Sequence, residues 1–152
     1  MIQQKLENTG EIIAVDYSAG MLHTARKRIK KNHWKNIRLL HEDARNLSAQ
    51  YFLRRGIEPN FDVLIGELAF SVIPDWEDVM KTTASVVRKG GRVGLLDWYR
   101  KKNDRLTKVV NYLAQAEVSR DTIGFARKLF ADFRVIAWFL SGNVYVGVGE
   151  NA

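Results

Sequence analysis

The stretch "GEIIAVDYSAGMLHTARKR", residues 10–28, decides the fold that we expect for this chain. Its first part, residues 10–16, is rich in Ile and Val and ends in Asp16, which is typical of a strand buried on both faces in a parallel sheet. Ser18 is a suitable N-cap for the helix that follows. The apolar residues of that helix recur at helical spacing and are Met21, Leu22, Ala25 and Ile29. A strand that brings an acid to the start of a helix often faces a nucleotide-like ligand.

The rest of the chain continues this alternation of strand and helix. Further strands are predicted at 36–40, in the apolar run 61–73 and at 92–99. Between the last two, a helix is expected to follow Pro74, with Asp75 as its N-cap and Gly90-Gly91 as its end. Such alternation favours an α/β fold, in which a mostly parallel sheet is covered by helices on both faces.

The end of the chain has a different pattern. "FRVIAWFL" and "VYVGVGE" are both strand-like and flank a short Ser-Gly-Asn turn. We therefore expect an antiparallel hairpin at the end of an otherwise alternating chain.

Four acids fall at the ends of the predicted strands. They are Asp16, Asp43, Glu67 and Asp97. In open α/β sheets the ligand lies beyond the carboxyl ends of the strands, so these acids form a candidate site.

Composition limits the function further. With 152 residues, 46% of them hydrophobic, the chain has material for a single domain over 1–152. Cysteine is absent and the three histidines lack metal-ligand spacing, so no metal site is expected. The sequence shows no secretory signal and no apolar run long enough to cross a bilayer, which predicts a soluble, cytoplasmic protein.

The formal net charge of +7 comes largely from two basic clusters, at 26–35 and 100–108. Such clusters attract nucleic acid, anionic lipid or acidic substrates. The alternative is a solvated helix face and a loop, because Trp34 is the only aromatic residue within the first cluster and no RNA-binding signature is present.

Taken in order, these pieces resemble the class I S-adenosylmethionine-dependent methyltransferases, particularly the branch of small-molecule, quinone and lipid methyltransferases. The matching segments span nearly the whole chain. They are "IIAVDYSAGMLHTAR", "LLHEDARNL", "FDVLIGELAFSVIPDWEDVMKTTASVVRKGGRVGLLDW" and the terminal hairpin. The resemblance implies a Rossmann-like methyltransferase sheet and S-adenosylmethionine as cofactor.

The resemblance also implies roles for individual residues. Asp16 would accept hydrogen bonds from both ribose hydroxyls, which suits a carboxylate with two acceptor oxygens. Tyr17 and Met21 would lie against the ribose and adenine. Asp43 would accept from the adenine amino group, while the backbone of Ala44 addresses the ring edge. Glu67 through Phe70 would border the methionine part of the cofactor and the methyl acceptor.

Each role has a structural alternative. Asp16 also suits a helix-capping acid and Asp43 a turn residue. Met21 and Phe70 are also plausible core residues, and Asp97 also suits a purely structural position. The catalytic residues are unknown, since a general base is needed only if the acceptor must lose a proton. By location, the candidates for such a base are His41, Glu67 and Tyr99.

One part of the family pattern is not found. Family members open with a strand and a glycine-rich loop that approaches the cofactor closely, whereas residues 1–10, "MIQQKLENTG", resemble only the later part of the helix after that loop. We therefore expect an N-terminally incomplete domain whose first, central strand is missing. Two strands would then have unpaired edges, which favours their direct pairing, a strand from another chain, a longer parent protein or a homo-oligomer.

Three functions follow from these observations. The first is methyl transfer to a small-molecule or lipid-like acceptor. The second is a catalytically inactive or partner-completed methyltransferase-like interaction domain. The third is an RNA-directed methyltransferase that uses the basic clusters.

Overall fold

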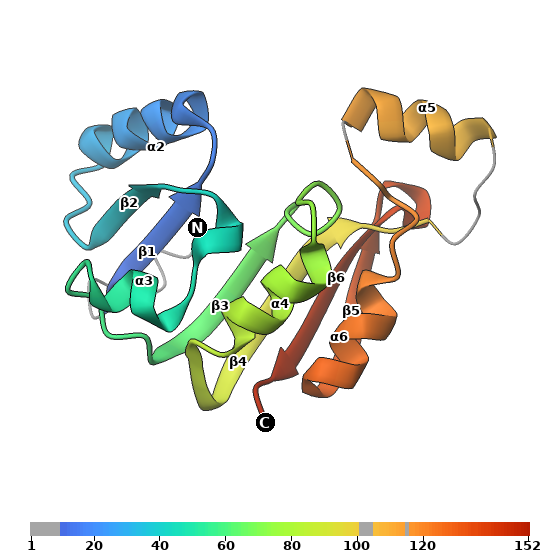
Figure 1. The fold of residues 1–152 in the computed structure, drawn as a ribbon. Helices are drawn as coiled ribbons and strands as arrows, with labels where there is room; N and C mark the ends of the chain where they lie inside the picture. Colours follow the sequence, from blue (N-terminus) through green and yellow to red (C-terminus); the bar gives the residue numbers. More distant parts are fainter. Residues whose placement is uncertain (1–9, 101–104, 115) are drawn as a thin grey trace. The chain divides into compact units, whose positions relative to one another are not determined.

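The computed structural model describes residues 10–100, 105–114 and 116–152 (Figure 1). By its internal contacts the chain divides into two compact units, the first ending at Asn46 and the second beginning at Leu47. We call them unit 1 and unit 2 and describe each by itself. The single domain expected over 1–152 stays a prediction.

Unit 1 contains the strand and helix that the opening stretch predicts. Strand β1, Ile12–Asp16, pairs in parallel with β2, Ile37–His41, and the two are joined by helix α2, Ala19–Lys31. Ser18 caps α2 by accepting a hydrogen bond from the backbone N–H of Met21, as expected. A short 3-10 turn, η1, Ala44–Asn46, ends the unit. The predicted strand, cap and helix of this region are therefore confirmed.

Unit 2 contains a four-stranded sheet in the order β3-β4-β6-β5. Its strands are β3, Phe61–Glu67; β4, Val87–Trp98; β5, Ala131–Phe139; and β6, Val144–Glu150. Its helices are α3, Ala49–Leu53; α4, Trp76–Ala84; α5, Arg105–Ala114; and α6, Thr122–Leu129, with a 3-10 turn, η2, Leu140–Gly142. β3 and β4 are parallel, whereas β6 is antiparallel to both of its neighbours, which confirms the α/β class and the terminal hairpin.

The two faces of this sheet differ. Val93, Leu95 and Tyr145 lie on one face and are buried. Helix α6 covers that face, since the Tyr145 hydroxyl donates to Thr122 Oγ1 at 3.0 Å, and α4 lies on the same side (Figure 1). Val63 and Ile65 point to the opposite face and are about half exposed.

Helix α4 differs from its prediction at both ends. Asp75 occupies the N-cap position, but its φ is +52° and its side chain makes no capping hydrogen bond. The helix ends at Ala84, well before Gly90-Gly91, because Val87 already belongs to β4. The N–H of Phe61 donates to the Val86 carbonyl at 2.9 Å. Val86 and Val87 are β-branched and favour a strand, so pairing with β3 ends the helix there although the apolar spacing alone favours its continuation.

Three other expectations need correction or fall outside the structure. The strand predicted over 61–73 ends at Glu67, because Leu68 turns the chain with a φ of +51°. Met21 is 61% exposed and is therefore not part of the helix core. The interpretation of residues 1–9 as the end of a helix lies outside the described residues. In the part that is described, β1 pairs only with β2, and β3 only with β4.

Two absences hold for the residues described. None of the helices there is both long enough and apolar enough to span a membrane. No group of three or more His, Cys, Asp or Glu side chains within these ranges is arranged to hold a metal ion.

Candidate functional site

The carboxyl ends of β1 and β2 form one edge of unit 1. Asp16 lies opposite His41 in the strand register, and the N–H of Glu42 donates to the Asp16 carbonyl at 3.2 Å. The Asp16 side chain accepts one hydrogen bond, from the N–H of Ser18 to Oδ1 at 2.8 Å. Within the described ranges its Oδ2 has no hydrogen-bond partner, so this carboxylate retains acceptor capacity for a ligand.

Tyr17 and Met21 follow Asp16 in the chain, Met21 in the first turn of α2, and they expose most of their side chains, 76% and 61% respectively. The tyrosine backbone is fixed, because His41 Nε2 lies 2.8 Å from the Tyr17 carbonyl. Since a carbonyl only accepts, this hydrogen bond places a proton on Nε2 and leaves Nδ1 as the acceptor in the neutral ring. The contact of Tyr17 and Met21 with the ribose and adenine stays a prediction.

Asp43 lies just beyond β2, at the same edge as Asp16. Arg45 holds its carboxylate through Nε at 3.0 Å and Nη2 at 2.6 Å. This side-chain hydrogen bonding by Arg45 lowers the pKa of Asp43, so the group is ionised at neutral pH and has remaining acceptor lone pairs. Unit 1 therefore brings Asp16, Asp43 and Ala44 to one edge, and their roles toward a cofactor stay a prediction.

In unit 2 the corresponding edge is the carboxyl end of β3. Glu67 is its last residue and is exposed. The following residue, Leu68, is in the left-handed region with φ +51°, a strained conformation for a leucine that often occurs at functional sites. Phe70 is only 3% exposed, which matches the alternative of a core residue; its role beside the cofactor stays a prediction.

Asp97 holds the loop after β3, residues 68–75, which we call the site loop. Its carboxylate accepts from the N–H of Ser71 at 3.0 Å, from the Ser71 hydroxyl and from the N–H of Trp98 at 2.8 Å. The aspartate is fully buried, and burial raises its pKa. Asp97 therefore has the structural role that the sequence left open, and it turns away from the exposed edge.

Arg120 holds the same loop from the other side. Its Nη1 donates to the carbonyls of Phe70 at 2.8 Å and Ile73 at 2.6 Å, and its Nε pairs with Glu117 at 2.7 Å. The N–H of Glu117 also donates to the Ser71 carbonyl at 2.7 Å. The side chains of Asp97 and Arg120 thus fix the backbone of the site loop, which leads away from Glu67.

Two of the residues that hold the site loop, Ser71 and Arg120, were not expected from the sequence. Ser71 carried a usable signal, since a hydroxyl inside the apolar run "LAFSVI" needs a partner when it is buried. Arg120 carried none, because its two carbonyl partners lie 47 and 50 residues away in the chain.

Gly66 allows Phe70 to fold back over β3, and Gly66→Ala should therefore destabilise unit 2. A Cβ at this position would lie 2.7 Å from Phe70 Cε2 and 3.2 Å from Leu95 Cδ2. We expect the free energy of unfolding in urea to fall by about 1–3 kcal/mol, the usual cost of overpacking.

The matched control for Gly66→Ala is Gly94→Ala on the neighbouring strand, where an added Cβ meets nothing within 4 Å. This change should be neutral or slightly stabilising, because Ala loses less backbone entropy than Gly. Equal effects of the two substitutions would contradict the proposed packing of Phe70.

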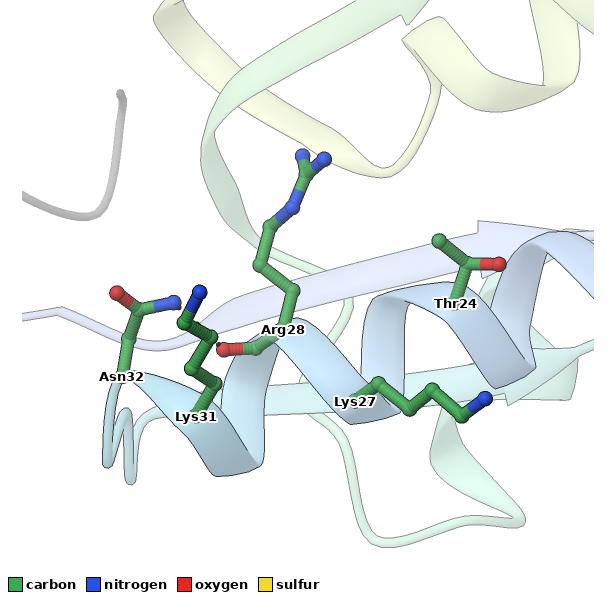
Figure 2. A pocket seen from close by; sticks show the side chains of 5 residues that line it. All are labelled: Thr24, Lys27, Arg28, Lys31 and Asn32. Atoms are coloured by element: carbon green, nitrogen blue, oxygen red, sulfur yellow. Dashed lines mark hydrogen bonds between the residues drawn. The ribbon is translucent and has the colours of Figure 1, made fainter.

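Residues 26–31 of the first basic cluster lie on α2, and residues 32–35 follow the end of that helix. Figure 2 shows its side chains around a shallow pocket of about 580 Å³, lined by Thr24, Lys27, Arg28, Lys31 and Asn32. Asn32 Nδ2 donates to the Arg28 carbonyl at 2.7 Å, so the asparagine closes the helix end. Cations in the last turn also complement the helix dipole. These features match a solvated helix face, one of the two interpretations of this cluster.

Comparison with known proteins identifies relatives of the chain. Residues 1–91 match a protein family described as "Methyltransferase domain". A demethylmenaquinone methyltransferase of Staphylococcus saprophyticus is 29% identical over 96 residues, which cover 63% of this chain and 37% of that protein. A phosphatidylethanolamine N-methyltransferase of Cereibacter sphaeroides is 28% identical over 115 residues, covering 75% of this chain and 52% of that protein.

Solved structures extend the likeness to the fold of the whole chain. An O-methyltransferase family protein from Burkholderia thailandensis superposes with a TM-score of 0.69 at 15% identity, covering 99% of this chain and 47% of that chain. At this identity the match shows a shared fold. The chain spans between about a third and a half of the length of the two curated relatives named above.

Proposed function

This chain belongs to the class I S-adenosylmethionine-dependent methyltransferase family, and on that premise we propose that it transfers a methyl group from S-adenosylmethionine to a small-molecule or lipid-like acceptor. The observation that carries the proposal is the open edge of unit 1. There Asp16 keeps free acceptor capacity at the end of β1, and Tyr17 and Met21, which follow it in the chain, expose most of their side chains.

We assign the donor groups of the cofactor to the acceptors at this edge. Asp16 would hold the ribose through its two carboxylate oxygens, since both ribose hydroxyls are donors. Asp43, kept ionised by Arg45, would accept from the adenine amino group beside Ala44. The resemblance assigns the methionine part and the acceptor to Glu67 through Phe70.

The acceptor class is supported by the relatives. One is named for a demethylated menaquinone and the other for phosphatidylethanolamine, and both names describe lipid-soluble molecules. We extend to this chain only what the two have in common, an acceptor with a polar reactive group and an apolar body.

When bound, the sulfonium cofactor supplies an electrophilic methyl group. The acceptor atom forms a bond to the methyl carbon while the carbon–sulfur bond breaks, and sulfur keeps the electron pair. The protein contributes positioning, which accounts for much of the rate in such displacements. If the acceptor carries a proton, His41, Glu67 and Tyr99 are the candidates to receive it.

Calorimetric titration of the purified 152-residue chain tests the proposal. S-adenosylmethionine and S-adenosylhomocysteine should each bind with a micromolar dissociation constant. Absence of binding heat at millimolar ligand would contradict cofactor binding by this chain.

The second candidate is a methyltransferase-like interaction domain that acts together with a partner. It is favoured by the edges of β1 and β3, each of which lacks a strand partner in the described residues. Light scattering distinguishes the two: a stable dimer without cofactor binding would favour the interaction domain, and a cofactor-binding monomer would exclude it.

A further inference from the structure

The end of β5 and the turn that follows it expose three consecutive apolar residues, of which the first two end the strand and the third begins η2. Trp138, Phe139 and Leu140 are 48%, 53% and 63% exposed. We call these three residues the apolar tip. Leucine is unusual at Leu140, the turn position, because turns generally carry Gly, Asn, Asp and Ser.

The apolar tip is also strained. Leu140 has φ +48° and Ser141 has φ +55°, both in the left-handed region. This conformation suits Gly or Asn and is unfavourable for leucine. Leu140 therefore combines an unfavourable backbone conformation with an exposed apolar side chain.

The strained turn is held in place. The N–H of Tyr99 donates to the Asn143 carbonyl at 2.9 Å, and Arg100 Nη1 donates to Asn143 Oδ1 at 2.8 Å. Asn143 Nδ2 in turn donates to the Leu140 carbonyl at 2.6 Å. The ring of Trp138 lies 6.0 Å from that of Tyr99. These hydrogen bonds fix the backbone of the turn that carries Leu140.

The apolar tip lies at the functional edge of unit 2. Val144 pairs with both Trp98 and Phe139, so the turn lies beyond the carboxyl end of β4. Because β3 is parallel to β4, Glu67 ends at the same edge. Three strand spacings separate β3 from β5, which places the tip roughly 14 Å along the edge from Glu67.

Helix α5 is linked to this turn through Arg100. Arg100, which binds Asn143 in the turn, also donates through Nε to Thr107 Oγ1 on α5 at 3.0 Å. Figure 1 shows α5 at the end of the sheet where this turn lies. Tyr112 on α5 is 84% exposed, and Lys108, one helical turn earlier, is exposed too.

From these observations we infer that the apolar tip inserts into the interface of an anionic phospholipid bilayer. Tryptophan and tyrosine prefer the headgroup region, and lysine pairs with anionic lipid. The net charge of +7 favours approach to such a surface. The inference rests on the proposed function, because a protein that methylates a lipid-like acceptor must meet that acceptor where it dissolves.

The size of the apolar tip favours a membrane over a second copy of the chain. About half of each of the three side chains is exposed. At about 150–250 Å² for each large side chain, the exposed area of the apolar tip is roughly 300 Å². A stable protein–protein interface buries about 800 Å² on each partner. Shallow, reversible insertion into a bilayer needs no such area.

The test is sedimentation of the purified chain with vesicles of phosphatidylglycerol and phosphatidylcholine. The variant Phe139→Ser/Leu140→Asn should weaken binding at least tenfold without changing the net charge. Since Asn tolerates a positive φ, the Leu140→Asn change should leave the melting temperature unchanged or higher, which separates lost binding from unfolding. The control is Ile136→Ser on β5, which removes an apolar side chain that is 56% exposed and should change binding less than twofold.

The outcomes separate this inference from the proposed function. Equal vesicle binding by wild type and the double variant would overturn the inference, as would a dimer that the double variant dissociates. Titration with S-adenosylhomocysteine is run on the same samples. Cofactor binding without vesicle binding overturns the membrane contact alone, and vesicle binding lost in the double variant supports that contact even if no cofactor binds.

Discussion

Asp97→Ala should lower the free energy of unfolding by roughly 3–5 kcal/mol, because it leaves three donors without their acceptor in a buried site. Those donors are the N–H and hydroxyl of Ser71 and the N–H of Trp98. Urea denaturation followed by circular dichroism measures the loss. If this variant is too unstable to purify, Asp97→Asn keeps one acceptor oxygen and should show a smaller loss.

The matched control is Asp78→Ala on α4. Asp78 is 78% exposed and pairs with Lys81 at 2.9 Å, a surface contact. Its removal should change the free energy of unfolding by less than about 0.5 kcal/mol. A similar loss at both positions would show that Asp97 does not hold the site loop.

The same residue predicts a pH dependence. Burial raises the pKa of Asp97 in the folded protein above its value in the unfolded chain. The folded state therefore binds the proton of Asp97 more tightly than the unfolded chain does. The contribution of this proton to the free energy of unfolding is present below the pKa of Asp97 in the unfolded chain, near 4, and is lost as pH rises through its pKa in the folded protein. Measured between pH 3 and 7, the stability difference between wild type and Asp97→Asn should be largest at the acidic end.

Asp97 also shows which part of the site the sequence could predict. Its position at a strand end follows from the pattern "GLLDW". The positions of Asp16 and Glu67 follow in the same way from the apolar runs that precede them. The direction of its side chain does not, because strand residues alternate between faces and the register is set by pairing with β3 and β6. The sequence thus places acids at an edge without telling which of them reaches a ligand.

The fold was predictable where local and long-range preferences agree. Ser18, with its apolar helix positions downstream, predicts α2 correctly, and the Ser-Gly-Asn turn predicts the β5–β6 hairpin. Local and long-range preferences disagree over residues 85–91. There the apolar residues keep helical spacing, but pairing of Val87 with Phe61 extends β4. Arg120 is a further case, since its contacts with residues about 50 positions away leave no local pattern.

Asp16→Asn should weaken binding of S-adenosylhomocysteine by about 10- to 100-fold, or roughly 1.5–3 kcal/mol, if Asp16 holds the ribose. Two hydroxyl donors need two acceptor oxygens, and the amide replaces one of these with a donor. Asn retains an oxygen for the N–H of Ser18, the 2.8 Å hydrogen bond that Asp16 makes at the start of α2. The helix cap should therefore survive, and calorimetry should report a change in affinity with an unchanged melting temperature.

Two comparisons make this prediction specific to the ribose. Glu11→Gln removes the same charge from an exposed carboxylate just before β1, at the end of that strand away from Asp16, and should leave the dissociation constant within twofold. Asp16→Ala should weaken binding at least as much as Asp16→Asn, and it should also lower the melting temperature, because the N–H of Ser18 loses its acceptor. Unchanged affinity in Asp16→Asn would assign Asp16 to helix capping alone, whereas equal losses in Glu11→Gln would point to a general effect of charge.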